Sequence, residues 1–198
     1  MERQSTVGLD FFDSQKFIYS SCNLAWDSVK NNKYEVKGSR DVGWLNKTLS
    51  NFDKNKNSLY IITGKKSDLT VIDIDDGEKC KELVDMLNPI ETLKVRTRKG
   101  FHCYFKYISN IKNMNRSQEM GFDVLTDDKC VYAPPSYYQI SESLKFTYDF
   151  IDMIEPVQIP DEIENYLRKK HIEKLVKTHI EKSSCEKSSS EKKQIKQK

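Results

Sequence analysis

The clearest pattern along the chain is a set of short apolar runs that predict β-strands. Residues 69–75 contain Leu69, Val71, Ile72 and Ile74 and stop before a glycine, as a buried strand does. Similar runs predict strands at residues 57–64, 92–98, 101–107, 122–125, 130–133 and 145–150. Because a short polar loop separates the first two strands along the chain, we expect 57–64 and 69–75 to form a hairpin.

Apolar residues at helical spacing predict a smaller number of helices. In residues 77–87, the apolar positions fall at i, i+3, i+4 and i+7, as on one face of a helix. Further helices are predicted at residues 14–30, at 44–52 and from Pro160, where acids follow in the first turn. This mixture of strands and helices predicts an α+β fold.

The chain has the length and composition of one globular domain with a polar tail. It has 198 residues, of which 37% are hydrophobic and 32% are charged. We expect a main domain over residues 1–155, a C-terminal helix over 156–180 and a disordered tail over 181–198. The tail holds six Lys and three Glu, which account for the whole net charge of +3. Overall basicity therefore gives no argument for nucleic-acid binding by the domain.

Composition also excludes several classes of protein. The five cysteines are scattered without a CxxC or zinc-binding spacing, which is typical of reduced thiols in an intracellular protein. No apolar run approaches the roughly 20 residues that span a bilayer, and the first residues open no signal peptide. Residues 63–67 lack the spacing of a Walker A loop. We expect an intracellular protein with no membrane partner.

Acidic residues in two predicted strands suggest a metal site. Asp73 and Asp75 lie two residues apart on one strand, so their side chains point the same way, and Asp123 lies in another strand. Carboxylates that share a face repel one another unless a cation lies between them, and such oxygen-rich groups suit Mg²⁺ or Mn²⁺. Asp76 faces the opposite way, so we assign it to the start of the next helix. The competing interpretation is that the acids only cap that helix.

Basic residues lie close to these acids in the sequence. From Lys94 to Arg116 there are seven basic residues and no acid, and His102 lies inside this run. Three carboxylates can hold two divalent cations about 3.5–4 Å apart, which stabilise the attacking and leaving oxygens of a phosphoryl transfer. Arg, Lys and His can bind the phosphate oxygens. Nucleotide chemistry fits this set better than ester or peptide hydrolysis.

In order and spacing, these motifs resemble the bifunctional DNA primase/polymerase (prim-pol) domain of the archaeo-eukaryotic primase superfamily. Four segments carry the resemblance: residues 59–75, 97–105, 121–124 and 131–136. The metal ligands that it implies, for a two-metal site with Mg²⁺ or Mn²⁺, are Asp73, Asp75 and Asp123. His102 would contact the phosphates of the incoming nucleotide. The nucleotide site would also be lined by Arg98, Lys65 and Ser67.

The resemblance also implies a fold and an activity. The fold would be an N-terminal α/β lobe packed on an RRM-like sheet, with the active site between them. Residues 1–155 would be the catalytic domain of a DNA primase and DNA-directed polymerase. It would synthesise or extend primers on single-stranded DNA from nucleoside triphosphates during replication. No helicase domain is present, so a replicative helicase partner would be a separate chain, unless this chain is a fragment.

Departures from the family pattern leave alternatives open. Gly100 and Phe101 replace the residues usual before the histidine, and residues 127–129 replace a glycine-rich turn, so the choice of nucleotide sugar is not determined. One alternative is a non-catalytic module that binds single-stranded DNA or a replication partner. Another is a metal-dependent nuclease or phosphoesterase. We favour the polymerase, because a decayed domain is expected to lose its carboxylates first and all three are present.

Overall fold

The computed structural model describes residues 2–40, 43–115, 117–173 and 175–176. The chain divides into two compact units, Met1–Ile159 and Pro160–Lys198. The first unit combines helices with antiparallel sheets, which confirms the predicted α+β class. Among the described residues, no helix has the length and apolar character needed to cross a membrane.

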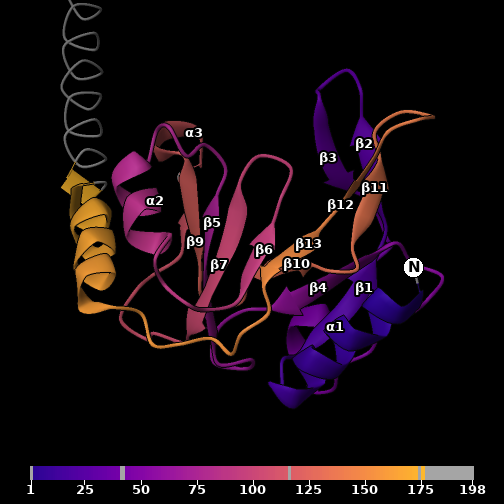
Figure 1. Ribbon diagram of the computed structural model, residues 1–198, viewed down its shortest axis with the longest axis horizontal. Coiled ribbons are helices and arrows are strands. Elements are labelled where there is room, and N and C mark those ends of the chain that lie inside the picture. The colour runs from indigo at the N-terminus through magenta and orange to yellow at the C-terminus, as the bar shows by residue number, and fades with distance from the viewer. Residues whose placement is uncertain (1, 41–42, 116, 174, 177–198) are drawn as a thin grey trace, which may run out of the picture. The chain divides into compact units, whose positions relative to one another are not determined.

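The centre of the first unit is a six-stranded antiparallel sheet (Figure 1). Its order is β13-β6-β7-β5-β9-β8, so β5 has neighbours on both sides. The strand bounds are Leu69–Ile74 (β5), Lys94–Arg96 (β6), Phe101–Lys106 (β7), Met114–Asn115 (β8), Phe122–Leu125 (β9) and Asp149–Asp152 (β13). The predicted turn between residues 96 and 101 joins β6 to β7 as a hairpin.

A second sheet contains β1 (Tyr19–Cys22), β4 (Ser58–Ile62) and β10 (Cys130–Ala133) in the order β1-β4-β10. The predicted hairpin between residues 57–64 and 69–75 is therefore wrong, because β4 and β5 lie in different sheets. Only an isolated bridge between Gly64 and Leu69 joins their adjacent ends. Each strand instead pairs with segments distant in sequence, β4 with β1 and β10, and β5 with β7 and β9.

The helix predicted at residues 14–30 is also wrong. Helix α1 occupies Glu2–Ser14, and Lys16 follows it with a φ of 58°, a left-handed conformation that ends a helix. The chain then forms β1 and β2 (Leu24–Asp27). Val29, which we placed on the buried helix face, is 93% exposed at a hairpin turn. Pairing of β1 with β4 satisfies the backbone there, and this outweighs a helical spacing that had no caps.

Two small hairpins and several short helices complete the unit. Strand β2 pairs with β3 (Asn32–Glu35), and β11 (Tyr137–Gln139) pairs with β12 (Lys145–Thr147). The helices are α2 (Lys81–Leu87), α3 (Ser117–Met120) and the 3₁₀ helix η1 (Trp44–Asn46). The helix predicted at 77–87 is confirmed in its last two turns, whereas the one predicted at 44–52 is a single turn.

One apolar core joins the two larger sheets. It contains Ile61 from β4, Val71 from β5 and Val95 from β6, together with Tyr19 and Tyr104. Side chains along a strand alternate between the two faces of a sheet, so one face of the six-stranded sheet packs into this core. Any polar group on this same face of β5 lies at the border of the core.

The second unit is helical over residues 161–173, as predicted from Pro160. The backbone N–H of Glu164 donates to the Pro160 carbonyl, which closes the first turn. The predicted disordered tail at 181–198 lies outside the described residues.

Candidate active site

The register of the six-stranded sheet aligns three of the predicted site residues. Asp73 on β5 lies opposite His102 on β7 and opposite Asp123 on β9. Directly paired residues of antiparallel strands project to the same face. Asp75 follows the end of β5 and is two residues beyond Asp73. The strand pairing therefore brings the acid pair, the histidine and the third acid to one end and one face of the sheet.

Two glycines allow the chain to pack closely around the end of β5. A Cβ on Gly100 would lie 2.1 Å from the Ile74 carbonyl oxygen, and one on Gly121 would lie 2.2 Å from that of Asp76. Gly121 also has a φ of 79°, and its carbonyl accepts hydrogen bonds from the N–H groups of Asp75 and Asp76, at 2.8 and 2.9 Å. These contacts fix the backbone that carries Asp75.

His102 is a basic side chain that contacts Asp73. Its Nε2 lies 3.4 Å from Oδ1 of Asp73, and the side chains are 3% and 22% exposed. Among the described residues, no group makes a hydrogen bond of good geometry to Asp73 Oδ1, although this oxygen is buried. Burial alone would raise the pKa of Asp73, but His102, with Lys33 and Lys99, outweighs burial and lowers this pKa. Asp73 is therefore held as a carboxylate with an oxygen left to bind a cation.

Asp75 is in the opposite electrostatic situation. Burial raises its pKa, and so does the negative charge of Asp73 and of Asp123, despite the opposing effect of Lys99 and Lys33. This repulsion shows that the three carboxylates influence one another. Across the described part of the chain, however, no three His, Cys, Asp or Glu side chains converge closely enough to hold a metal ion. The metal site therefore stays a prediction, for which the hard oxygen donors and the unsatisfied Asp73 oxygen fit Mg²⁺ or Mn²⁺.

Asp76 contacts Lys79 and does not belong to this group of three carboxylates. Its Oδ1 accepts a hydrogen bond from the N–H of Lys79 at 3.4 Å, and its Oδ2 lies 3.5 Å from the Lys79 ammonium. The side chain thus serves the turn before α2, which matches its assignment to the start of that helix.

Much of the basic run from Lys94 to Arg116 is neutralised by acids from a later segment. Arg96 pairs with Asp149 at 2.6 Å, and Lys94 lies 3.7 Å from Asp152, both across the β6–β13 pair. Lys106 lies 3.3 Å from Glu155. The run is free of acids in sequence but not in space, so it does not form a continuous cationic face.

Arg98 is one of the predicted nucleotide-site residues, and it contacts the β2–β3 hairpin. Its guanidinium lies 4.7 Å from the centre of the Trp26 ring. Trp26 in turn stacks on Tyr138 of β11, with ring planes only 4° apart. Arg98 therefore connects the turn before His102 to the small hairpins.

Lys65 and Ser67 lie at the other end of β5. They belong to the turn before Leu69, and the six residues of β5 separate this turn from Asp75 by about 20 Å. Ser67 is buried, and its Oγ accepts a hydrogen bond from the N–H of Ile18 at 2.9 Å, whereas Lys65 is exposed. The structure does not bring these two residues to the carboxylates, and their contact with nucleotide stays a prediction.

Comparison with known families agrees with this arrangement. The family model described as bifunctional DNA primase/polymerase, N-terminal (Prim-Pol) matches residues 29–162, more than half of the chain. The chain belongs to the Prim-Pol family. A search of curated proteins finds no match to the chain. The Prim-Pol match contains the whole six-stranded sheet, whereas α1, β1 and β2 precede it.

The structure adds two cations that sequence reasoning did not assign to the site of this Prim-Pol domain. Lys33 on β3 and Lys99 in the β6–β7 turn both lower the pKa of Asp73 and of Asp75. Lys99 could have been found from its place three residues before His102. Lys33 gave no such signal, because it lies forty residues before Asp73 and directly after the segment 14–30 that sequence pattern predicted as helix.

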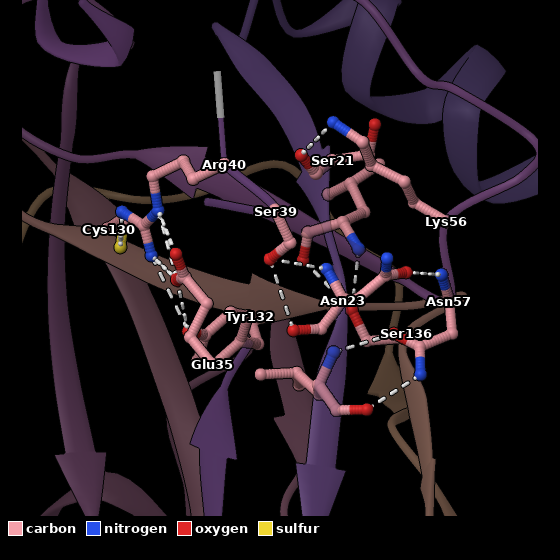
Figure 2. A network of polar contacts seen from close by, with 12 residues as sticks. Ser21, Asn23, Glu35, Ser39, Arg40, Lys56, Asn57, Cys130, Tyr132 and Ser136 are labelled. Atoms are coloured by element: carbon pink, nitrogen blue, oxygen red, sulfur yellow. Dashed lines mark hydrogen bonds and ion pairs between the residues drawn. The ribbon is translucent and has the colours of Figure 1, made fainter. Parts of the chain in front are cut away.

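A polar network fixes strand β3, which carries Lys33 (Figure 2). Arg40 donates to both carboxylate oxygens of Glu35, and Glu35 also accepts from the Tyr132 hydroxyl at 3.0 Å. On the preceding strand, the N–H of Leu24 donates to Asn57 Oδ1 at 2.8 Å. Because Glu35 lies two residues after Lys33, the network sets the direction in which Lys33 projects.

Proposed function

We propose that this Prim-Pol domain is a metal-dependent nucleotidyltransferase, a DNA primase/polymerase that synthesises or extends primers on single-stranded DNA during replication. The observation that carries the proposal is the alignment of Asp73, His102 and Asp123 across β5, β7 and β9, with Asp75 at the strand end. Its substrates would be nucleoside triphosphates and a single-stranded DNA template.

The charged residues have distinct roles in this proposal. Asp73, Asp75 and Asp123 would hold two Mg²⁺ or Mn²⁺ ions, whose contribution when bound is to neutralise charge on the phosphoryl oxygens. His102 would donate a hydrogen bond to the triphosphate, and its contact with Asp73 orients the imidazole. Arg98 would form part of the nucleotide site.

Sheet topology supports the RRM-like arrangement that the family implies. Strands β6, β7, β5 and β9 are neighbours in that order, and α2 connects β5 to β6 across the intervening β7. The carboxylates lie at the border of the core shared by the two larger sheets, which favours an active site between the two parts of the domain.

Primer synthesis on single-stranded DNA tests the proposal. The wild-type chain is incubated with Mg²⁺ or Mn²⁺ and with ribonucleotides or deoxyribonucleotides in separate reactions. We expect Asp73→Asn and Asp75→Asn to lower incorporation by at least about 1000-fold, because each removes a charged metal ligand. Asp76→Asn is the matched control, since this neighbouring carboxylate contacts Lys79, and it should retain activity.

Three results would contradict the proposal. Normal incorporation by the Asp73→Asn/Asp75→Asn double variant would exclude a role for these carboxylates in catalysis. Salt-dependent DNA binding without incorporation in either metal would indicate a non-catalytic module. Shortening of the DNA would indicate a nuclease built on the same acids.

A further inference from the structure

Lys33 makes an unusual set of contacts for a surface lysine. Its ammonium donates a hydrogen bond to the hydroxyl of Tyr148 and lies 5.2 Å from the ring centres of both Tyr132 and Tyr148. The side chain is partly buried rather than extended into solvent. Among the described residues, no carboxylate lies within 4.0 Å of this ammonium. Within the described part of the chain, Lys33 is thus held in place by phenol groups and not by an ion pair.

The contacts of Tyr148 lead from Lys33 to the aligned site residues. The ring of Tyr148 lies 6.1 Å from that of His102, and His102 contacts Asp73. Lys33 and His102 therefore both contact the same tyrosine. Tyr148 itself is 1% exposed, so its buried ring supports both side chains.

The contacts through Tyr148 and His102 place Lys33 near the carboxylates, without an ion pair to any described acid. Its ammonium therefore remains able to bind an anion that approaches this end of the sheet.

We propose that Lys33 binds the triphosphate of the incoming nucleotide. A lysine ammonium has three donors, and one is used by the Tyr148 hydroxyl, which leaves two for phosphate oxygens. A triphosphate also brings negative charge to a site that already has three carboxylates, and a lysine ammonium offsets part of this charge. The inference rests on the proposed function and adds to it a residue from the β2–β3 hairpin.

Nucleotide binding without turnover tests this role. Dissociation constants for dATP, ATP, dAMP and AMP are measured with the full chain in Ca²⁺, which does not support incorporation. We expect Lys33→Met to weaken binding of dATP or ATP by about tenfold to a hundredfold, the usual effect of losing a charge-assisted hydrogen bond. Binding of the monophosphates should change by less than about threefold, because they lack the outer phosphates. Lys33→Arg should recover part of the loss.

Lys30 provides a matched control on the same hairpin. Its side chain is 75% exposed and lies 3.8 Å from Asp27, so Lys30→Met removes the same charge without touching Tyr148. We expect this variant to bind all four nucleotides as the wild type does. Near-ultraviolet circular dichroism, which is sensitive to the Trp26–Tyr138 stack, reports whether the hairpin keeps its place in each variant.

The outcomes separate this inference from the proposed function. Unchanged triphosphate binding in Lys33→Met would overturn the inference, and so would an equal loss for monophosphates and triphosphates, which indicates a structural role. If the wild type incorporates nucleotides and Lys33→Met does so with an unchanged KM, only the inference fails. If the wild type binds triphosphate through Lys33 but incorporates none, the proposed function fails and the inference stands.

Discussion

Arg40 shows how one side chain can fix a polar segment. Its guanidinium lies between the rings of Trp44 and Tyr60, 4.4 Å from each centre, and it donates to both oxygens of Glu35. A planar cation can stack and form a forked hydrogen bond at the same time, which lysine cannot do. The arginine thereby joins η1, β3 and β4, and the hairpin that carries Lys33 depends on this attachment.

We expect Arg40→Met to lower the free energy of unfolding by about 1–3 kcal/mol, because it leaves Glu35 without its charged partner in a mostly buried place. Urea denaturation measures the loss. The control is Arg96→Met, whose pair with Asp149 has side chains 61% and 44% exposed, so its loss should stay below about 1 kcal/mol. Similar losses in the two variants would show that the Arg40 network adds nothing beyond an exposed ion pair.

At the scale of elements, the end of β5 depends on the turns that pack against it. Gly100 opens β7 and Gly121 opens β9, and each contacts the backbone of residues 74–76. The same two strands carry His102 and Asp123. Close packing of glycine on backbone therefore couples the position of Asp75 to the register of both neighbouring strands.

Alanine at either glycine should destabilise the fold by about 1–3 kcal/mol, because the added Cβ would overlap a carbonyl oxygen. Each has a control. Gly77→Ala meets only the Val84 side chain, at 3.6 Å, and is expected to be neutral, as a match for Gly100. Gly38 has a φ of 75° and nothing within 4 Å, so Gly38→Ala measures the conformational cost alone for comparison with Gly121. Thermal unfolding distinguishes the four variants, and equal shifts in each pair would contradict the packing argument.

At the scale of the whole molecule, acidic and basic side chains that are separate along the sequence lie next to one another in the folded structure. Acids of β13 and the segment after it neutralise Lys94, Arg96 and Lys106, so only part of the basic run is available to bind DNA. The net charge of +3 resides in residues 181–198. In the proposed function, DNA binding by the folded part would therefore depend on a few local cations near the carboxylates, such as Lys99.

Truncation after Thr178 tests this distribution of charge. We expect the salt dependence of single-stranded DNA binding to stay unchanged, because the cations that contact DNA belong to the domain and the tail Lys are mixed with Glu. If instead the four Lys of residues 192–198 contact phosphates, the slope of log K against log salt should fall by about 3. Titrations of a labelled oligonucleotide at several salt concentrations distinguish the two results.

The local pattern of the sequence by itself determined those elements in which an apolar run is bounded by turn residues. The strands around Asp73, His102 and Asp123 were predicted close to their observed bounds, and the motif order already indicated the family. This succeeded because a strand that packs into a core needs apolar residues at its inward positions, whatever segment it pairs with. The spacing of Asp73 and Asp75 on one strand face followed from the geometry of a single strand.

Only the tertiary structure decided which segments pair and which charges remain free. Residues 19–22 became a strand because β4 offered hydrogen-bond partners, and residues 24–27 became a strand by pairing with β3. Strands β4 and β5 separated into two sheets because each paired with distant segments. The same long-range pairing placed acids beside the basic run and brought Lys33 to Tyr148. Such contacts join residues far apart in the chain, and their energies arise only when the chain has folded, so no local pattern records them.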